Sequence, residues 1–519
     1  MAILLLLCPI LQYHVYLSHD ISWHLIETQR FLAGGTYSQN FMDIDPPIII
    51  YTLIIPVLIA KYLVMNIVWV TRCYVFLLCL ISLCCCLTVL KKLFFNNRLM
   101  LNVVAITISF ILLILPIYEF GQRDHLMLVF IFPYLCMICA LVSGFVFSRK
   151  LSMMISLLAG IGFIVNIKLW PLFLITEIYL TAHRGWKTFF RWETFIILGV
   201  TILYLVSIFI FTPDYVSFVL PLVMSLYVGG YNITWEEIFL SSASMSFIAS
   251  FIGYFLFLLQ TKKSKPLLTL CLIANTTFWV VYILTRKVWY YHQYTVLAFS
   301  LLMLVLMITE IISQYRFNAP HFVSIAMIVF LGFMLLIGPL KGYLNLQSEA
   351  YLTYNPHQST LLSKLIQTTQ QLAEHQSIFV FSVSMRQGTL MTYAHVDYAS
   401  RFNTLWMLPG LLDQARKKAV SEQRARQLQA NLLAQDLYHY RPEVIIVDNT
   451  NDFEYLDSDY FNYIAYFSEN RCFRALWQQY VPVKDIQNYV FYQRKKPFAN
   501  KNVKIASCEA LDQLLKPHE

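Results

Sequence analysis

Apolar segments of membrane-spanning length recur along the first two thirds of the chain. A transmembrane helix needs about 20 mainly apolar residues, so these segments are long enough, or nearly so, to cross a bilayer. They lie near residues 2–18, 68–90, 100–118, 126–147, 151–167, 169–182, 194–212, 238–259, 266–285, 294–313 and 321–339. The pattern predicts a polytopic α-helical membrane protein with about eleven transmembrane helices.

The segment from Pro46 to Val64 is also apolar, but it starts with two prolines and Pro56 and Lys61 interrupt it. If it does not span, every dense basic cluster falls on one side, which the positive-inside rule assigns to the cytoplasm. The clusters are Lys91-Lys92 with Arg98, Arg149-Lys150, His183-Arg184 with Lys187 and Arg191, Lys262-Lys263 with Lys265, and Arg316. We therefore predict an interfacial helix here, inside a first outer loop at 19–67, with the N-terminus in the cytoplasm.

This topology predicts a transmembrane domain at 1–340 and an extracytoplasmic, periplasmic domain at 341–519. Beyond residue 340 the composition becomes that of a soluble domain. Helical patterns and short apolar runs alternate there, which favours a small α/β domain. The expected helices are Ser359–His375, Leu411–Leu437 and Asp459–Glu469, and the expected strands are Ser377–Ser384, Glu443–Asp448 and Tyr489–Gln493.

The composition supports a membrane protein and excludes a soluble one. Hydrophobic residues make up 58% of the chain and charged residues only 13%, against about 25% charged in soluble domains. The net charge of +9 lies mostly in the clusters between apolar runs, so topology explains it better than nucleic-acid binding does. Among the 11 cysteines, Cys472 and Cys508 fall in the polar C-terminal part and are able to pair if it is extracytoplasmic.

The first polar stretch carries ionisable residues directly after the first apolar segment. Asp20 precedes a helical pattern that stops at Gly34-Gly35, with His24 on its polar stripe, and Asp45 stands just before Pro46. The pattern favours a helix lying in the membrane interface. Asp20 is then either an N-cap or a carboxylate held at the membrane surface to receive a proton or a metal.

Three further groups of ionisable residues interrupt apolar sequence on the predicted outer side. Charges in such places are costly unless they pair or face a cavity. The groups are Arg123-Asp124-His125, then Lys168 in "VNIKLWP", and then Arg286, Lys287, Tyr291 and His292 in "TRKVWYYHQY". Each has a structural interpretation, as an ion pair, a snorkelling lysine or an aromatic belt with cations. The last group also suits an anion site for a lipid phosphate.

The order of these features resembles the GT-C superfamily of polyprenyl-phosphate-dependent glycosyltransferases, nearest to the protein O-mannosyltransferase and lipid A aminoarabinose transferase branch. "HDISWHLIETQRFLAGG" and "DIDPPIIIY" match the family's two interfacial helices, with Asp20 as the first acid and Asp45 before the proline. Asp124 in "GQRDHL" matches the second acid, and Lys168 matches the lysine between the fifth and sixth spans. "RKVWYYH" is similar, more loosely, to the segment near the lipid phosphate. The family's common Asp-Glu pair is here Asp20-Ile21.

The resemblance implies transfer of a sugar from a polyprenyl-phosphate donor, such as undecaprenyl phosphate, to a lipid, glycan or protein of the envelope. Transfer would occur at the outer face of a membrane, which we expect to be the bacterial inner membrane, by a single displacement with inversion. Asp20 would be the general base, and Asp124 would orient the acceptor or hold a divalent metal with Asp20. The donor phosphate would be stabilised by Arg286, Lys287, His292 and Lys168.

Two other classes of membrane protein stay open at this point. A transporter or flippase of lipid-linked sugars would place its ionisable residues near the bilayer midplane rather than at one face. An O-antigen ligase or polymerase would use outer arginines and histidines, with a large loop between late spans. Partners common to these interpretations are a lipid-linked sugar and the bilayer, and none involves a nucleic acid.

Overall fold

The computed structural model describes residues 1–228, 233–261, 265–315, 321–374, 376–383, 387–417, 422–450, 456 and 461–495. The chain divides into two compact units, and each is described by itself. The membrane unit comprises Met1–Leu17, Thr52–Ser207 and Ile233–Asn355. The sheet unit comprises Ser18–Tyr51, Ile208–Asn232 and Pro356–Glu519.

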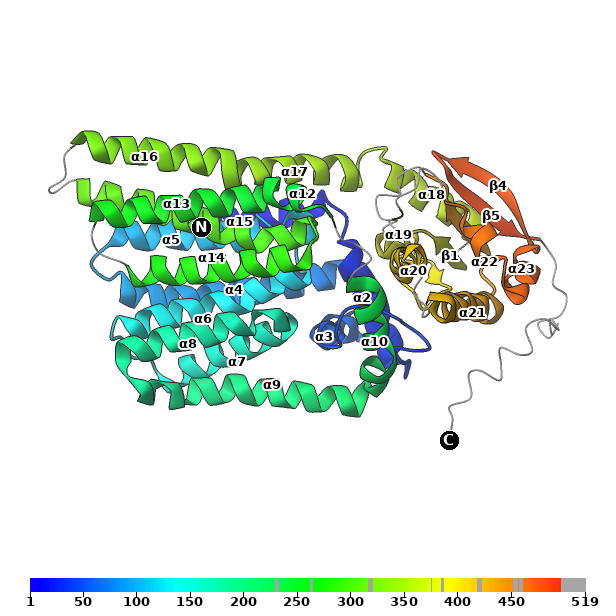
Figure 1. Ribbon diagram of the computed structural model, residues 1–519, viewed down its shortest axis with the longest axis horizontal. Helices are drawn as coiled ribbons and strands as arrows, with labels where there is room; N and C mark the ends of the chain where they lie inside the picture. Colours follow the sequence, from blue (N-terminus) through cyan, green and yellow to red (C-terminus); the bar gives the residue numbers. More distant parts are fainter. Residues whose placement is uncertain are drawn as a thin grey trace. The chain divides into compact units, whose positions relative to one another are not determined.

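The membrane unit is a bundle of apolar helices (Figure 1). Its helices are α1 (Ala2–Tyr13), α4 (Ile67–Leu93), α5 (Arg98–Leu113), α6 (Arg123–Val142), α7 (Arg149–Val165), α8 (Trp170–Arg184), α12 (Trp235–Leu240), α13 (Ser242–Thr261), α14 (Pro266–Thr285), α15 (Tyr290–Tyr315), α16 (His321–Leu335) and α17 (Lys341–Tyr354). Short helical turns are η1 (Ile117–Glu119), η2 (Ile167–Leu169), η3 (Trp186–Phe190) and η6 (Leu336–Leu340). Helices α3 (Ile48–Tyr62) and α9 (Trp192–Phe211) contain residues of both units.

All eleven segments chosen from hydropathy are helical, and the protein is a multi-pass membrane protein. Within the described residues, seven helices are long and apolar enough to cross a membrane, and α7 with η2 and α8 adds an eighth as one bent span. The predicted number of eleven is larger because it counted α7 and α8 as separate spans and included α1 and α5, which have only 12 and 16 residues. At about 1.5 Å per residue, both are shorter than a hydrocarbon core of about 30 Å.

The last span continues beyond the end predicted at residue 339. Ser324–Asn345 forms one apolar stretch, and a π-helical turn at Leu336–Leu340 carries the chain past Pro339 into α17. A π turn accommodates a residue that cannot donate the regular helical hydrogen bond. The boundary expected at residue 341 therefore falls inside a helical stretch that ends at Tyr354.

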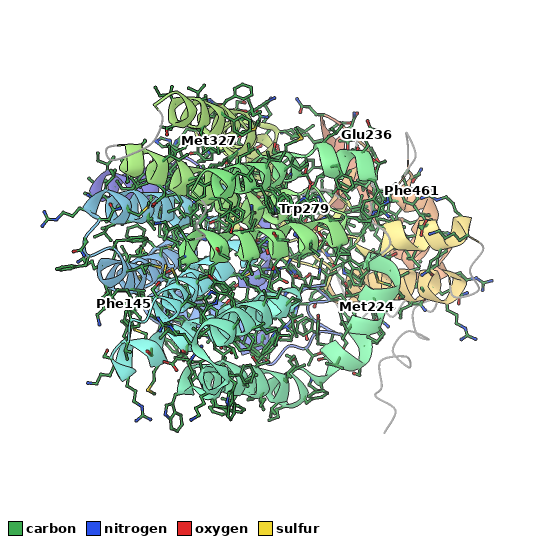
Figure 2. All side chains as sticks on the ribbon, turned by 60° about the vertical axis from the view of Figure 1, so that its left-hand side comes forward. Phe145, Met224, Glu236, Trp279, Met327 and Phe461 are labelled. Carbon is green, nitrogen blue, oxygen red and sulfur yellow. The ribbon has the colours of Figure 1, made fainter. Side chains whose placement is uncertain are left out.

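The core of the membrane unit is formed around α6, whose spanning residues are almost all buried. It packs against α4, α7, α8, α14 and α15. By contrast, α9 and the span at Ser324–Asn345 are mostly exposed and apolar, as expected for helices that face lipid. Aromatic packing adds contacts between helices, as where Trp279 of α14 stacks on Phe247 of α13 at 4.2 Å between ring centroids. Figure 2 labels Trp279 among the side chains of the bundle.

The sheet unit contains a five-stranded mixed sheet in the order β2-β1-β3-β5-β4. Strand β1 pairs in parallel with β2 and β3, and β5 pairs antiparallel with β3 and β4. The strands are β1 (Ser377–Phe381), β2 (Asp397–Tyr398), β3 (Val444–Asp448), β4 (Tyr480–Ile486) and β5 (Tyr489–Arg494). Every residue of β3 is buried, which explains its unbroken apolar run, because a parallel strand covered on both faces has no polar side.

The sheet unit also contains helices, among them α2 of the first loop. They are α2 (His19–Leu32), α10 (Leu220–Leu222), α18 (Leu361–Ala373), α19 (Gln387–Ala394), α20 (Met407–Arg416), α21 (Glu422–Tyr440), α22 (Tyr463–Phe467) and α23 (Arg471–Trp477), with π turns η4 (Tyr215–Val219) and η5 (Val223–Tyr227). The single helix expected at Leu411–Leu437 is two helices, α20 and α21. Cys472 is disulfide-bonded, whereas Cys508, its expected partner, lies outside the described residues.

Residues Ser18–Tyr51 belong to the same compact unit as the C-terminal sheet, although 300 residues of sequence and more separate them. Met42 is held through its main chain, since its N–H donates to the carbonyl of Arg401 and its carbonyl accepts from Trp406 Nε1 at 2.9 Å. Arg401 in turn donates to the carbonyl oxygen of Ser38 at 2.8 Å. The first loop and the C-terminal part, predicted as separate regions, thus fold as one body.

Candidate functional site

Asp20 lies in the first turn of α2 rather than at its N-cap, which is Ser18. Its Oδ1 atom lies 3.1 Å from Nε2 of His19, and its side chain is 19% exposed. A carboxylate in the first turn interacts favourably with the helix dipole. The N-cap interpretation of Asp20 is therefore wrong, and the carboxylate remains accessible for chemistry.

A cluster of ionisable groups brings together His24 and Glu27 of α2 with Asp43 and Asp45 of the loop after it. His24 Nδ1 lies 2.6 Å from Oε2 of Glu27 and 3.5 Å from Oδ2 of Asp43, while His24 Nε2 lies 3.4 Å from Oδ2 of Asp45. His24 and Glu27 share one face of α2 because residues three apart are neighbours on a helix. Glu27 is 1% exposed. These distances show a cluster of three carboxylates around one imidazole.

The environment of this cluster shifts the titration of its members. Burial alone lowers the pKa of His24, but hydrogen bonds with Asp45 and Glu27 and the charges of Glu27 and Asp43 raise that pKa well above its usual value. Burial raises the pKa of Glu27, which the neighbouring His24 opposes. Burial and the charge of Glu27 raise the pKa of Asp43 well above its usual range. These shifts all favour bound protons, so burial and the crowding of ionisable groups act against an unprotonated cluster.

Asp124 forms the centre of a second cluster, in the membrane unit. It lies in the first turn of α6, with its main-chain N–H capped by Oε1 of Gln122 at 2.7 Å. Asn166 donates to its Oδ1 at 3.1 Å, and its Oδ2 lies 3.9 Å from both His292 Nδ1 and Arg123 Nη2. The structure therefore brings together Asp124, Arg123 and His292 as candidates from the sequence, and adds Asn166, which sequence reasoning missed.

His125, the next residue along, has a structural role. Its Nδ1 accepts a hydrogen bond from the main-chain N–H of Gly121 at 2.8 Å. Its Nε2 lies 2.8 Å from the carbonyl oxygen of Leu112 and donates to it. Both ring nitrogens are therefore used inside a ring that is 1% exposed. Of the three adjacent ionisable residues, Arg123 and Asp124 remain candidates for chemistry and His125 holds the helix start in place.

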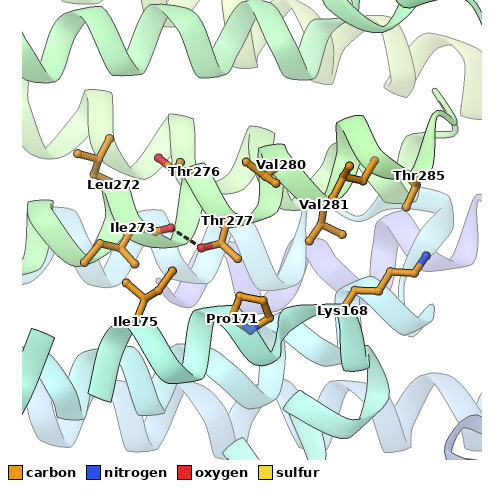
Figure 3. Close-up of a pocket in the computed structure, with 11 residues that line it drawn as sticks. Lys168, Pro171, Ile175, Leu272, Ile273, Thr276, Thr277, Val280, Val281 and Thr285 are labelled. Atoms are coloured by element: carbon orange, nitrogen blue, oxygen red, sulfur yellow. Dashed lines mark hydrogen bonds between the residues drawn. The ribbon is translucent and has the colours of Figure 1, made fainter. Parts of the chain in front are cut away.

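Lys168 lies at the end of an apolar groove between α8 and α14. The chain bends there by 114° between α7 and the helix that follows, because Asn166 leaves the helical conformation and Pro171 lies in the first turn of α8. The groove has a volume of about 510 Å³. Figure 3 shows Lys168 at one end, beside Thr285, and carbon-rich side chains along the rest. Its lining is Lys168, Pro171, Ile175, Leu272, Ile273, Thr276, Thr277, Val280, Val281, Leu284 and Thr285.

The basic segment after α14 makes contacts of its own. Arg286 adopts a left-handed conformation with φ 50° at the C-cap, donates to the carbonyl oxygen of Ile233 at 2.6 Å and lies 4.8 Å from the ring of Trp235. The ammonium of Lys287 lies 5.1 Å from the ring of Trp289. The guanidinium of Arg286 is thus engaged in fixing the turn, and the cation–π contact holds Lys287 near the aromatic residues.

His292 lies on the aromatic face of this segment and reaches the Asp124 cluster. Its ring stacks on Trp289 at 5.8 Å and lies 4.3 Å from the ring of Tyr291, both between centroids. The same ring brings Nδ1 to 3.9 Å from Asp124. His292 therefore links the segment expected near a lipid phosphate with the second acid.

Comparison with solved structures identifies the architecture. The chain matches ArnT from Cupriavidus metallidurans bound to undecaprenyl phosphate, with a TM-score of 0.54 over 95% of this chain and 97% of that one, at 11% sequence identity. The apo form of the same protein matches with a TM-score of 0.53, at 10% identity and the same coverage. The chain has the GT-C fold. No family model and no curated protein matches the sequence.

The candidate acids lie in different units of this chain. Asp20 and the His24 cluster belong to the sheet unit, whereas Asp124 and Lys168 belong to the membrane unit. A joint site of Asp20 and Asp124, for a metal or for an acceptor, stays a prediction. Glu27 and Asp43 were also missed as site residues, although the spacing of His24 and Glu27 on one predicted helix was a signal for the first of them.

Proposed function

We propose that the protein is a membrane glycosyltransferase that moves a sugar from a polyprenyl phosphate to an acceptor of the cell envelope. One observation carries the proposal, namely the apolar groove that ends at Lys168. An isoprenoid chain needs an apolar surface, and its phosphate needs a cation at the end of that surface. The GT-C fold shared with ArnT, which is bound to undecaprenyl phosphate in its structure, supports this choice of ligand.

The chemistry follows from the charges that develop during transfer. When an acceptor hydroxyl or amine attacks the anomeric carbon, it loses a proton and the lipid phosphate leaves with increased negative charge. Asp20 accepts the proton as general base, which requires it to lie within hydrogen-bond reach of the acceptor. Lys168 stabilises the leaving phosphate, and Lys287, with Arg286 and His292 in the same segment, adds positive charge.

Asp124 and its partners orient the acceptor in this scheme. The hydrogen bond from Asn166 and the nearby side chains of His292 and Arg123 fix the carboxylate. A carboxylate fixed in this way accepts hydrogen bonds from the hydroxyl-bearing or amine-bearing substrate and holds that substrate in one orientation. A single displacement inverts the anomeric configuration. We propose the bacterial inner membrane as the location, and from the distribution of basic residues we propose its outer face as the side of the reaction.

The test uses purified full-length protein in lipid nanodiscs and an undecaprenyl-phosphate sugar as donor. We expect donor turnover in wild type and loss of at least about 1,000-fold in Asp20→Asn, since the amide cannot accept the acceptor's proton. Asp485→Asn, an exposed position in β4, is the matched control and should keep wild-type turnover. Comparative mass spectrometry of lipid A and glycans from wild-type, deletion and Asp20→Asn strains would identify sugar and acceptor. An Asp20→Asn protein with wild-type rates would contradict the assignment.

A further inference from the structure

The buried cluster around His24 in the sheet unit has the composition of a metal site. Ligand atoms of His24, Glu27 and Asp43 all lie within 4.8 Å of one another, and all three residues are buried. We propose that these three residues bind one divalent transition-metal ion, with Zn²⁺ or Mn²⁺ as the expected occupant. The site is separate from the predicted pair of Asp20 and Asp124.

The donor atoms are arranged as a metal would require. Ligand atoms about 2.0–2.2 Å from a tetrahedral metal are roughly 3.3–3.5 Å apart. His24 Nδ1 and Asp43 Oδ2 are 3.5 Å apart already, and the 2.6 Å between His24 Nδ1 and Glu27 Oε2 opens to that distance by rotation of the glutamate side chain. One imidazole nitrogen with two carboxylates is a ligand set used by zinc, and carboxylates also suit manganese.

Asp45 lies where a supporting carboxylate is usual. A histidine that binds a metal through one ring nitrogen nearly always donates its other N–H to a carboxylate or carbonyl, which fixes the tautomer. Here His24 directs Nδ1 toward Glu27 and Asp43, and Nε2 lies 3.4 Å from Oδ2 of Asp45. The two nitrogens therefore have the distinct surroundings of a metal-bound imidazole.

Glu27 provides an independent indication of a ligand. Its side chain is 1% exposed, and apart from the carboxyl group of Asp43, with which Glu27 shares a hydrogen bond, its Oε1 atom finds no donor among the described residues. A buried carboxylate oxygen without such a donor is costly, and a bound cation removes the cost.

The loop that carries Asp43 is fixed independently of any ion. The neighbouring residue Met42 is 0% exposed and is held at its N–H by Arg401 and at its carbonyl by Trp406. Asp43 itself accepts a hydrogen bond from the main-chain N–H of Ile44 through Oδ1 at 2.6 Å, which leaves Oδ2 toward His24. A ligand set held by packing in this way binds metal without a large ordering cost.

The test is metal content and metal-dependent stability of the full-length protein in detergent, so it is independent of glycosyl transfer. After gel filtration, elemental analysis should find about one Zn²⁺ or Mn²⁺ per chain. EDTA should remove the ion and lower the melting temperature, and adding the same ion should restore it. Asp45→Asn should weaken the ion's affinity by about 10 to 100-fold, and Glu27→Gln and Asp43→Asn should weaken it further.

Asp413→Asn provides the matched control, because Asp413 lies in the same unit and pairs with Lys417 at the surface. This variant should keep the wild-type affinity. EDTA-treated wild type that binds neither ion at about 1 mM would overturn the proposal, as would wild-type affinity in both Glu27→Gln and Asp43→Asn. If either variant fails to fold, the titration of wild type alone decides the question. Loss of transfer activity with normal metal binding would count against the proposed function only.

Discussion

Arg30 of α2 donates a hydrogen bond from Nη1 to the main-chain carbonyl oxygen of Ser400, 2.7 Å away and 370 positions later in the chain. The same Nη1 donates to the carbonyl of Asn40 at 2.5 Å, and Nη2 donates to the carbonyl of Tyr398. The guanidinium also lies 5.8 Å from the ring of Trp23. One side chain thus joins α2, the loop after it and the end of β2, and it holds the helix that carries Asp20 against the C-terminal part of the sheet unit.

Replacing Arg30 should therefore loosen the helix on which Asp20 lies. Arg30→Ala removes three charge-assisted hydrogen bonds, each worth about 1.5–3 kcal/mol, and we expect a loss of at least about 3 kcal/mol. Arg30→Lys should recover only part of it, because an ammonium lacks the planar fork that reaches several carbonyls. The measurement is the melting temperature together with limited proteolysis of the first loop.

Arg471, exposed at the start of α23, is the control for the Arg30 variants. Arg471→Ala should leave both the melting temperature and the proteolysis pattern unchanged. Equal behaviour of Arg30→Ala and Arg471→Ala would show that the three carbonyl contacts do not hold the loop.

Gly388 allows α19 to approach the start of α2. A Cβ at this position would lie 2.4 Å from the carbonyl oxygen of His19 and 2.8 Å from the main-chain N of Trp23. Both are backbone atoms of a helix, so they have little freedom to move away. Gly388→Ala should lower the melting temperature and displace Asp20, with a loss of about 1–3 kcal/mol.

Gly199 of α9 is the matched position for this substitution, since a Cβ there would meet nothing within 4 Å. Gly199→Ala should be neutral or stabilise the helix by up to about 1 kcal/mol. Thermal unfolding of the two variants in the same detergent compares them directly. A Gly388→Ala protein as stable as Gly199→Ala would mean that α19 and α2 can separate without cost.

The sequence predicts the membrane bundle well because the bilayer acts as a uniform solvent. Apolar length and the cost of charge in lipid determine where helices lie, and all eleven predicted segments are helical. The same cost explains why Asp124 and Lys168 stood out as candidates. Helix length was less predictable, because α1 ends at Tyr13 and the last span continues past Pro339.

The His24 cluster shows what hydropathy cannot predict. Glu27 meets His24 through helical spacing, but Asp43 meets it only because the loop at 33–42 folds back onto α2, and that loop is fixed by Arg401 and Trp406. Trp406 contacts Met42 across 364 positions, and no local pattern encodes such a contact. Asn166 was missed for a similar reason, since its role appears only when the bend places it against Asp124.

Asp124 and His125 are adjacent but should respond to mutation in different ways. Asp124→Asn removes the charge while an amide oxygen can still accept from Asn166, so folding should persist. Transfer should fall by at least about 100-fold in kcat, because the carboxylate that orients the acceptor is lost. Steady-state kinetics in nanodiscs, with the melting temperature measured in parallel, separates the two effects.

His125→Ala should give the opposite result. It leaves the N–H of Gly121 and the carbonyl of Leu112 without their partner in a buried place, at a cost of about 1–3 kcal/mol for each group. We expect a clearly lower melting temperature and kcat within about threefold of wild type in the folded fraction. A stable His125→Ala protein with strongly reduced kcat would instead place His125 in the catalytic machinery.

The groove between α8 and α14 should bind the isoprenoid chain. Neither of the candidate acids Asp20 and Asp124 lines it, so a bulky substitution in the groove tests lipid binding without changing these acids. Val280 lines the groove and is 44% exposed, so Val280→Trp places an indole in the space of about 510 Å³. In Val280→Trp we expect the Kd for undecaprenyl phosphate to rise at least about tenfold. Lys168→Met should also weaken the binding of undecaprenyl phosphate, but it should leave the binding of undecaprenol, which has no phosphate, unchanged. Val329→Trp, at a 65% exposed position of α16, tests for a general effect of the indole and should bind like wild type. Binding measured by native mass spectrometry or tryptophan quenching decides the matter, and unchanged affinity in Val280→Trp would place the lipid elsewhere.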